Sequence, residues 1–235
     1  MSAEFSELER RLKELTKWHV RAVATFAAFE TILKLRAPNL VGEAEAKGNA
    51  EAIGRYKGLF NTAEKACNYE LLMTLARIFV AHKDALYIER LVNFAEQNQK
   101  RLTVEDFKEF HEGREYLDEL IAIYQGLNKN DLAEINQGLQ NAQDSIGRLK
   151  ELRDQTLAHI NLAPPDDVSL TYQELADLIE LSEKIINTLS ARYFQSGSYF
   201  KLYEEQVIDD TTALVRLARL ENDQSELIEE LLEGR

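Results

Sequence analysis

The stretch LRDQTLAHIN, residues 152–161, combines side chains that suit proton transfer beside a phosphate. Arg153 carries a permanently charged fork of donors, which fits a phosphate and stabilises charge that grows on its oxygens. His159 titrates near neutral pH and can take a proton from a hydroxyl group. Asp154 is placed to fix the histidine tautomer or the arginine fork of a second subunit. Arg153, His159 and Asp154 are therefore the candidate catalytic residues.

A regular helix would separate the arginine from the histidine. Six residues give a rise of about 9 Å and an angular difference of about a third of a turn. One chain alone would therefore make a poor two-residue site, whereas two copies across a dyad would place two such pairs around one groove. On a helical wheel, Asp154 points roughly away from Arg153, which falls near the middle of an apolar stripe made of Ile146, Leu149, Leu157 and Ile160.

A structural interpretation of the same residues stays open. An arginine that faces an apolar surface cannot lose its proton, so it needs an anion or water as a partner. A carboxylate from a neighbouring helix would satisfy Arg153, and His159 would then stabilise the C-terminal end of its helix. The residue pattern alone does not separate this ion pair from a phosphate site.

Composition limits the classes of protein that fit. The chain has 235 residues, of which 45% are hydrophobic, and its formal net charge is −13. That charge opposes attraction of the whole protein to nucleic acid, so any RNA contact requires a local basic pocket. The single cysteine, Cys67, excludes an internal disulfide. Without an apolar leader or a run long enough to span a bilayer, we expect a soluble cytoplasmic protein with no membrane contact.

Helical periodicity covers nearly the whole chain, and we see no strand pairs. The pattern predicts a helix over 4–36 and either a looser helix or a loop over 39–58. Further helices are predicted over 59–82, from 84, over 103–124, 131–160 and 171–194, and from about 210 onward. The fold class is therefore all-α, an antiparallel helical bundle with a C-terminal helical extension. We expect one bundle over 1–195, with a long N-terminal helix, and an acidic extension over 196–235.

Motifs for metals and cofactors are missing from the sequence. HEGRE, residues 111–115, lacks the second histidine of a zinc-protease helix, and no Glu-x-x-His occurs. The sequence also lacks a glycine-rich phosphate-binding loop. We therefore predict no metal and no cofactor, and we interpret His19, His82 and His111 as structural.

Two stretches carry a resemblance to a known family. LRDQTLAHIN resembles the arginine–polar–…–Ala-His signature of HEPN-domain proteins of the abortive-infection AbiU type. LARIFVAHKDALYIERLVNFA, residues 75–95, is similar to the upstream alanine–arginine–aliphatic–Phe helix of that family and the short leucine-bearing helix after it. Together the resemblances span about residues 60–190. The chain departs from the pattern at Val80, where aspartate often follows the phenylalanine, and at Asn161, where an acid is common.

The resemblance implies a HEPN-like bundle that cleaves RNA without a metal in the cleft of a homodimer. Arg153, His159 and Asp154 of both chains would line that cleft, with Thr156 and Asn161 as accessory residues. The products would be a 2′,3′-cyclic phosphate and a 5′-hydroxyl end. Such a protein would be a toxin or ribonuclease of phage defence or abortive infection, with RNA as its substrate and an antitoxin as a partner.

Two other functions remain compatible with the sequence. The first is a non-catalytic helical module that binds a nucleotide or a partner in the same dimer cleft. The acidity of the chain and the missing acid at Asn161 favour this alternative. The second is a structural helical protein in which Arg153 forms a buried ion pair.

Overall fold

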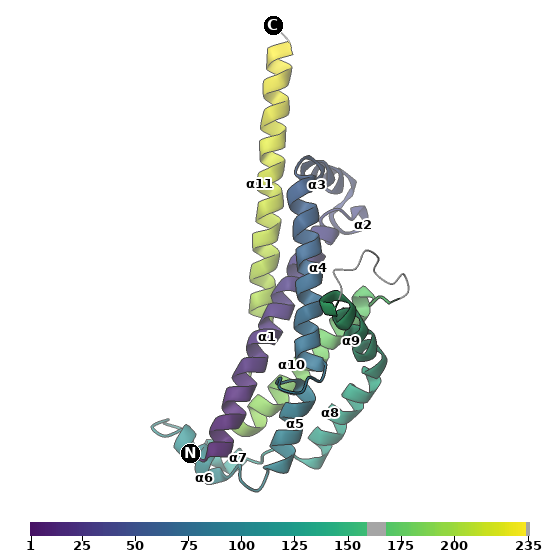
Figure 1. Cartoon of the computed structure of the whole chain (residues 1–235). Helices are drawn as coiled ribbons and strands as arrows, with labels where there is room; N and C mark the ends of the chain where they lie inside the picture. Colours follow the sequence, from purple (N-terminus) through teal and green to yellow (C-terminus); the bar gives the residue numbers. More distant parts are fainter. Residues whose placement is uncertain (159–167, 234–235) are drawn as a thin grey trace. The chain divides into compact units, whose positions relative to one another are not determined.

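The computed structural model describes residues 1–158 and 168–233, and within these ranges the secondary structure consists of helices without strands (Figure 1). This confirms the all-α prediction. No helix in the described ranges is both long enough and apolar enough to cross a membrane. In chain order the helices are α1 (Ala3–Lys34), α2 (Pro38–Val41), α3 (Glu43–Arg55), α4 (Lys57–Phe79), α5 (Ile88–Gln97), α6 (Val104–Phe110), α7 (Leu117–Ile123), α8 (Lys129–Asn141), α9 (Gln143–Ala158), α10 (Tyr172–Phe194) and α11 (Lys201–Glu233).

The chain divides into two compact units. The first unit consists of Met1–Ala22 and Leu72–Tyr199, and the second consists of Val23–Leu71 and Phe200–Arg235. The long helices α1 and α4 each contribute residues to both units. This division describes only which segments pack together. The domain boundary expected near residue 195 therefore stays a prediction.

The core of the first unit is apolar and aromatic. Helices α1, α4, α5 and α10 each bury one face, as their helical periodicity requires. At one end of this core, the Phe194 ring lies 5.0 Å from Phe5 and 5.1 Å from Phe110, measured between centroids. His111 is also fully buried, next to Phe107.

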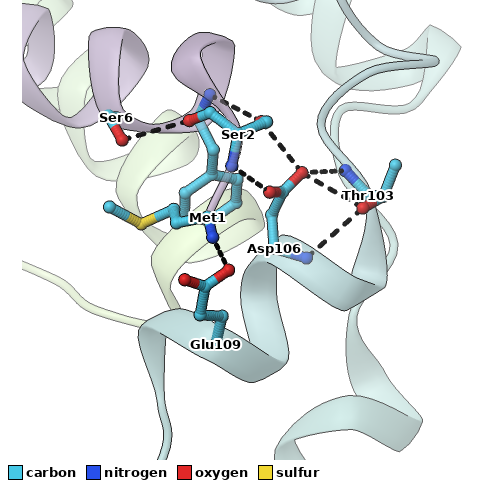
Figure 2. Close-up of polar contacts among 7 residues, drawn as sticks. Met1, Ser2, Ser6, Thr103, Asp106 and Glu109 are labelled. Atoms are coloured by element: carbon cyan, nitrogen blue, oxygen red, sulfur yellow. Dashed lines mark hydrogen bonds and ion pairs between the residues drawn. The ribbon is translucent and has the colours of Figure 1, made fainter.

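The N-terminal segment is tied to α6 through one carboxylate (Figure 2). Asp106 accepts hydrogen bonds from the backbone N–H of Ser2 and from its hydroxyl, the latter at 3.0 Å. The same carboxylate accepts from Thr103, which caps α6 in a reciprocal capping box. Burial alone would raise the pKa of Asp106, but these hydrogen bonds from Ser2 and Thr103 lower it overall.

The second unit has its own small core. Asn49 on α3 is buried and donates a hydrogen bond to the carbonyl of Leu35 at 2.9 Å, which satisfies a carbonyl just after α1. Helix α3 also packs on α11. The buried residues of this core are Ile32, Leu35, Ile53, Phe60 and Val215.

The helix boundaries differ from the predicted ones at several places. The segment 39–58, for which the sequence left a looser helix and a loop open, is largely helical and forms α2 and α3. The helix predicted over 103–124 is interrupted between α6 and α7, where Gly113 adopts a φ of +83° that L-residues rarely take. The helix predicted over 131–160 is divided into α8 and α9 at Ala142. Helix α5 begins later than predicted, at Ile88, and α11 begins earlier, at Lys201.

Candidate functional site

Helix α9 is anchored beside the start of α10 by Glu174. The Glu174 carboxylate accepts hydrogen bonds from the guanidinium of Arg148 on α9 and from the backbone N–H of Thr171 at 2.8 Å. The Arg148 hydrogen bond, followed by that of the Thr171 backbone, lowers the pKa of Glu174 to about 2. Thr171 and Glu174 form the capping box of α10, and the acidic member of this box also holds α9 in place.

Arg153 lies one turn and a half further along α9 and pairs with the residue that follows it. Its Nε and Nη2 atoms donate to one carboxylate oxygen of Asp154, at 2.8 and 2.5 Å. The Arg153 side chain is 16% exposed, whereas that of Asp154 is 52% exposed. The helical wheel placed these side chains in different directions, but both are long enough to meet. The carboxylate partner of Arg153 is therefore its neighbour in sequence rather than an acid on another helix.

Arg153 and Asp154 border a groove with a volume of about 650 Å³, here named the Arg153 groove. Its walls come from α1, α4, the connection between α4 and α5, and α9. The lining residues are Glu14, Trp18, Met73, Ala76, Arg77, Val80, His82, Ala85, Leu86, Arg153 and Asp154. All of them belong to the first compact unit. The groove thus joins the two stretches that carried the family resemblance.

Arg77 is the second cation of this groove. Its guanidinium carbon lies 4.4 Å from the ring centroid of Trp18, a distance at which the ring face attracts a cation. The indole Nε1 of Trp18 donates to Glu14 at 3.1 Å, which fixes the orientation of the ring. Arg77 and Arg153 therefore place two guanidinium groups, which can bind a phosphate, in one concave surface that also contains the carboxylates of Glu14 and Asp154.

The structure brings together only part of the predicted site. Arg153 and Asp154 lie in the groove, whereas His159 and Asn161 lie outside the described residues. Thr156 belongs to α9, and its side chain is likewise not described. A different histidine, His82, lines the groove.

Sequence reasoning did not select Trp18, Arg77 or His82 as site residues. Arg77 lies in the upstream stretch 75–95, so the family resemblance contained a signal for it. Trp18 had no such signal, because it lies on α1, far from both motifs in the sequence. Val80, which departs from the family pattern, is buried and forms part of the groove wall.

Comparison with known proteins gives one family. The model of a HEPN family described as AbiU2 matches residues 5–214, which include both motif stretches and the start of α11. No curated protein and no solved structure matches the chain.

Proposed function

The chain belongs to the AbiU2 family of HEPN proteins, and on this premise we propose that it is an abortive-infection toxin that cleaves RNA. In this proposal the protein acts in the cytoplasm as a homodimer, without a metal ion, and an antitoxin restrains it. The two subunits contribute their Arg153, Asp154 and His159 to one cleft, with Thr156 and Asn161 as accessory residues.

The reaction follows from the chemistry of these side chains. His159 removes the proton from a ribose 2′-hydroxyl, and the resulting oxygen attacks the adjacent phosphorus. The bond from phosphorus to the 5′-oxygen breaks, and this oxygen takes up a proton from water, which leaves a 2′,3′-cyclic phosphate and a 5′-hydroxyl end. Arg153 donates hydrogen bonds to the phosphate oxygens, whose negative charge increases in the transition state. Asp154 holds the arginine fork in the orientation that this step requires.

One observation carries the proposal. Arg153 shares its groove with Arg77 and the Trp18 ring, although the chain as a whole has a net charge of −13. A protein this acidic can bind RNA only through local positive groups. The groove offers two guanidinium groups, of which Arg153 is paired with Asp154, and Glu14 also lines it. The aromatic ring beside the cations also suits a nucleic-acid base.

The test uses RNA and three matched variants. Purified wild-type protein, His159→Ala, Arg153→Gln and Arg101→Gln are incubated with total RNA and transfer RNA, and the 3′ ends are mapped. Arg101 is a suitable control because it lies in the same unit and pairs with Glu4 outside the groove. Cleavage by wild type and Arg101→Gln alone, with cyclic-phosphate ends, supports the proposal. Intact RNA in the presence of a folded wild-type dimer contradicts it.

A non-catalytic binding module is the second candidate. It is favoured by the pairing of Arg153 with Asp154, which already compensates part of the charge that a phosphate would meet. Such a module would bind a nucleotide or a partner in the same cleft and would be harmless when expressed. His159→Ala would then change ligand affinity only, whereas for a ribonuclease it would abolish toxicity.

A further inference from the structure

A second groove lies in the same compact unit, beside the connection between α4 and α5. It has a volume of about 570 Å³ and is here named the Lys83 groove. Arg11 of α1, His82 and Lys83 of the connection, and Arg90 and Phe94 of α5 contribute to its walls. Its size falls within the range of pockets that hold small organic ligands.

Among the residues that the structure describes, the lining of this groove is cationic and includes no carboxylate. Lys83 and Arg90 are exposed, and neither forms an ion pair within the part of the chain that is described. Arg11 is different, because Glu7 accepts its Nε hydrogen bond at 2.7 Å. Lys83 and Arg90 therefore supply the uncompensated positive charge, which is unusual on a surface with a large excess of acidic residues.

Arg90 also gives the connection a defined conformation. Its Nη1 atom donates to the carbonyls of Lys83 and Ala85, at 3.4 and 3.0 Å. The backbone N–H of Ala85 donates to the carbonyl of His82 at 3.2 Å, which closes a turn around Lys83. In the same lining, the Arg11 guanidinium carbon lies 4.1 Å from the ring centroid of Phe94. The lysine is thus presented on a turn that is already formed, next to fixed walls.

The two grooves are neighbours that share one lining residue. His82 contributes to the walls of both the Arg153 groove and the Lys83 groove. A ligand with regularly spaced negative charges could therefore contact Arg77 and Arg153 in one groove and Lys83 in the other. A single-stranded nucleic acid has this charge pattern, and the ring of Tyr87 in the Lys83 groove suits its bases.

We propose that the Lys83 groove is an accessory phosphate-binding subsite, which holds the RNA strand next to the phosphate bound in the Arg153 groove. The proposal rests on the function proposed above, and it adds where the strand runs and which residues hold it. Lys83 provides the contact to a phosphate, and Arg90 both adds charge and shapes the turn. These residues position the strand and take no part in the bond-breaking step.

The experiment measures binding without cleavage. A fluorescently labelled oligouridylate is titrated with the full chain carrying His159→Ala, at several salt concentrations. The same measurement is made after adding Lys83→Gln, Lys83→Arg or Lys100→Gln. Lys100 is an exposed lysine of the same unit that lines neither groove, so its change alters the net charge equally.

We expect Lys83→Gln to weaken RNA binding about fivefold, as loss of one exposed ionic contact does. The slope of log affinity against log salt should fall by about 0.7, the value for one phosphate contact on a single strand. Lys83→Arg should restore both quantities, and Lys100→Gln should leave both at the parent value. Equal effects of the two glutamine variants would overturn the proposal, and so would the absence of any RNA binding.

Competitors identify the ligand. Unlabelled oligouridylate should displace the probe far more effectively than inorganic phosphate or uridine monophosphate, because only the strand contacts both grooves. If a monophosphate competed as well as the strand, the Lys83 groove would be a small-ligand site and not an RNA subsite. If polyglutamate competed as well as the strand, the groove would be a surface for an acidic protein. RNA binding that depends on Lys83, together with no cleavage by the wild type, would overturn the ribonuclease function and leave the subsite in place.

Discussion

Arg77 on α4 and Arg153 on α9 line one groove, and each is held by a different kind of partner. Arg153 is bound by the carboxylate of Asp154, whereas Arg77 lies over the face of Trp18. Like charges in one concavity repel each other, and an anion between them relieves that repulsion. An anionic ligand in the groove would meet the guanidinium of Arg77 and would compete with Asp154 for that of Arg153.

Arg77→Gln should weaken RNA binding about tenfold, because loss of one charge-assisted contact costs about 1.5 kcal/mol. Stability should change little, since Arg77 is exposed and a cation–π contact at such a site contributes only about 0.5–1 kcal/mol. Fluorescence anisotropy in the His159→Ala background measures the affinity, with Arg101→Gln as the control. An unchanged affinity would remove Arg77 from the binding surface.

Asp154→Asn should separate binding from catalysis. The change removes the negative charge that competes with a phosphate for Arg153, so RNA affinity should rise a few-fold. An amide holds the guanidinium less firmly than a carboxylate does, so the cleavage rate at saturating RNA should fall about tenfold. Single-turnover kinetics measure both quantities. A rate equal to that of the wild type would show that Asp154 does not orient the arginine.

Local signals in the sequence were sufficient for part of the fold. The capping boxes of α6 and α10 involve residues only three positions apart, Thr103 with Asp106 and Thr171 with Glu174, so the sequence reveals them directly. The interruptions at Gly113 and Ala142 were missed, because apolar residues recur at helical spacing on both sides of each break.

The candidate site shows the same division between local and distant information. Arg153 and Asp154 were recognised because the motif that contains them is continuous in the sequence. Trp18 and Arg77 come from separate helices, and only tertiary packing brings them to α9. The sequence likewise could not indicate that one carboxylate, Glu174, serves both the cap of α10 and the anchor of α9.

Glu174→Gln should loosen that anchor and lower the free energy of unfolding by about 1 kcal/mol at neutral pH. The pKa of Glu174 is about 2 in the folded protein, below its ordinary value of 4.5. Its contribution to stability is therefore present above pH 4.5 and is lost as the pH falls toward 2. Urea denaturation at neutral pH and near pH 2 tests this, with the exposed Glu180→Gln on the same helix as control. If Glu174→Gln and Glu180→Gln lowered the free energy of unfolding equally, the anchoring role of Glu174 would be contradicted.

A buried histidine should make the stability of the first unit depend on mild acid. His19 on α1 is fully buried, and its Nδ1 lies 2.7 Å from the Ser182 hydroxyl on α10. Burial lowers the pKa of His19 to about 4, although the Glu183 carboxylate, 4.0 Å from Nε2, favours the charged form. The unfolded chain therefore takes up the proton first as the pH falls below 6.5.

The contribution of His19 is thus complete above pH 6.5 and is lost as the pH falls to 4, by about 3 kcal/mol in all. Glu174, whose folded pKa is about 2, loses its contribution mainly at lower pH, so the two effects are separable. In His19→Gln the unfolding free energy should vary less between pH 6.5 and 4 than in the wild type. Ser182→Ala keeps the histidine, so the unfolding free energy should still depend on pH as in the wild type. Loss of the hydrogen bond should lower that free energy by about 1–3 kcal/mol. Denaturation curves across this pH range test the prediction. If the unfolding free energy of His19→Gln varied with pH as steeply as that of the wild type, His19 would not be the titrating group.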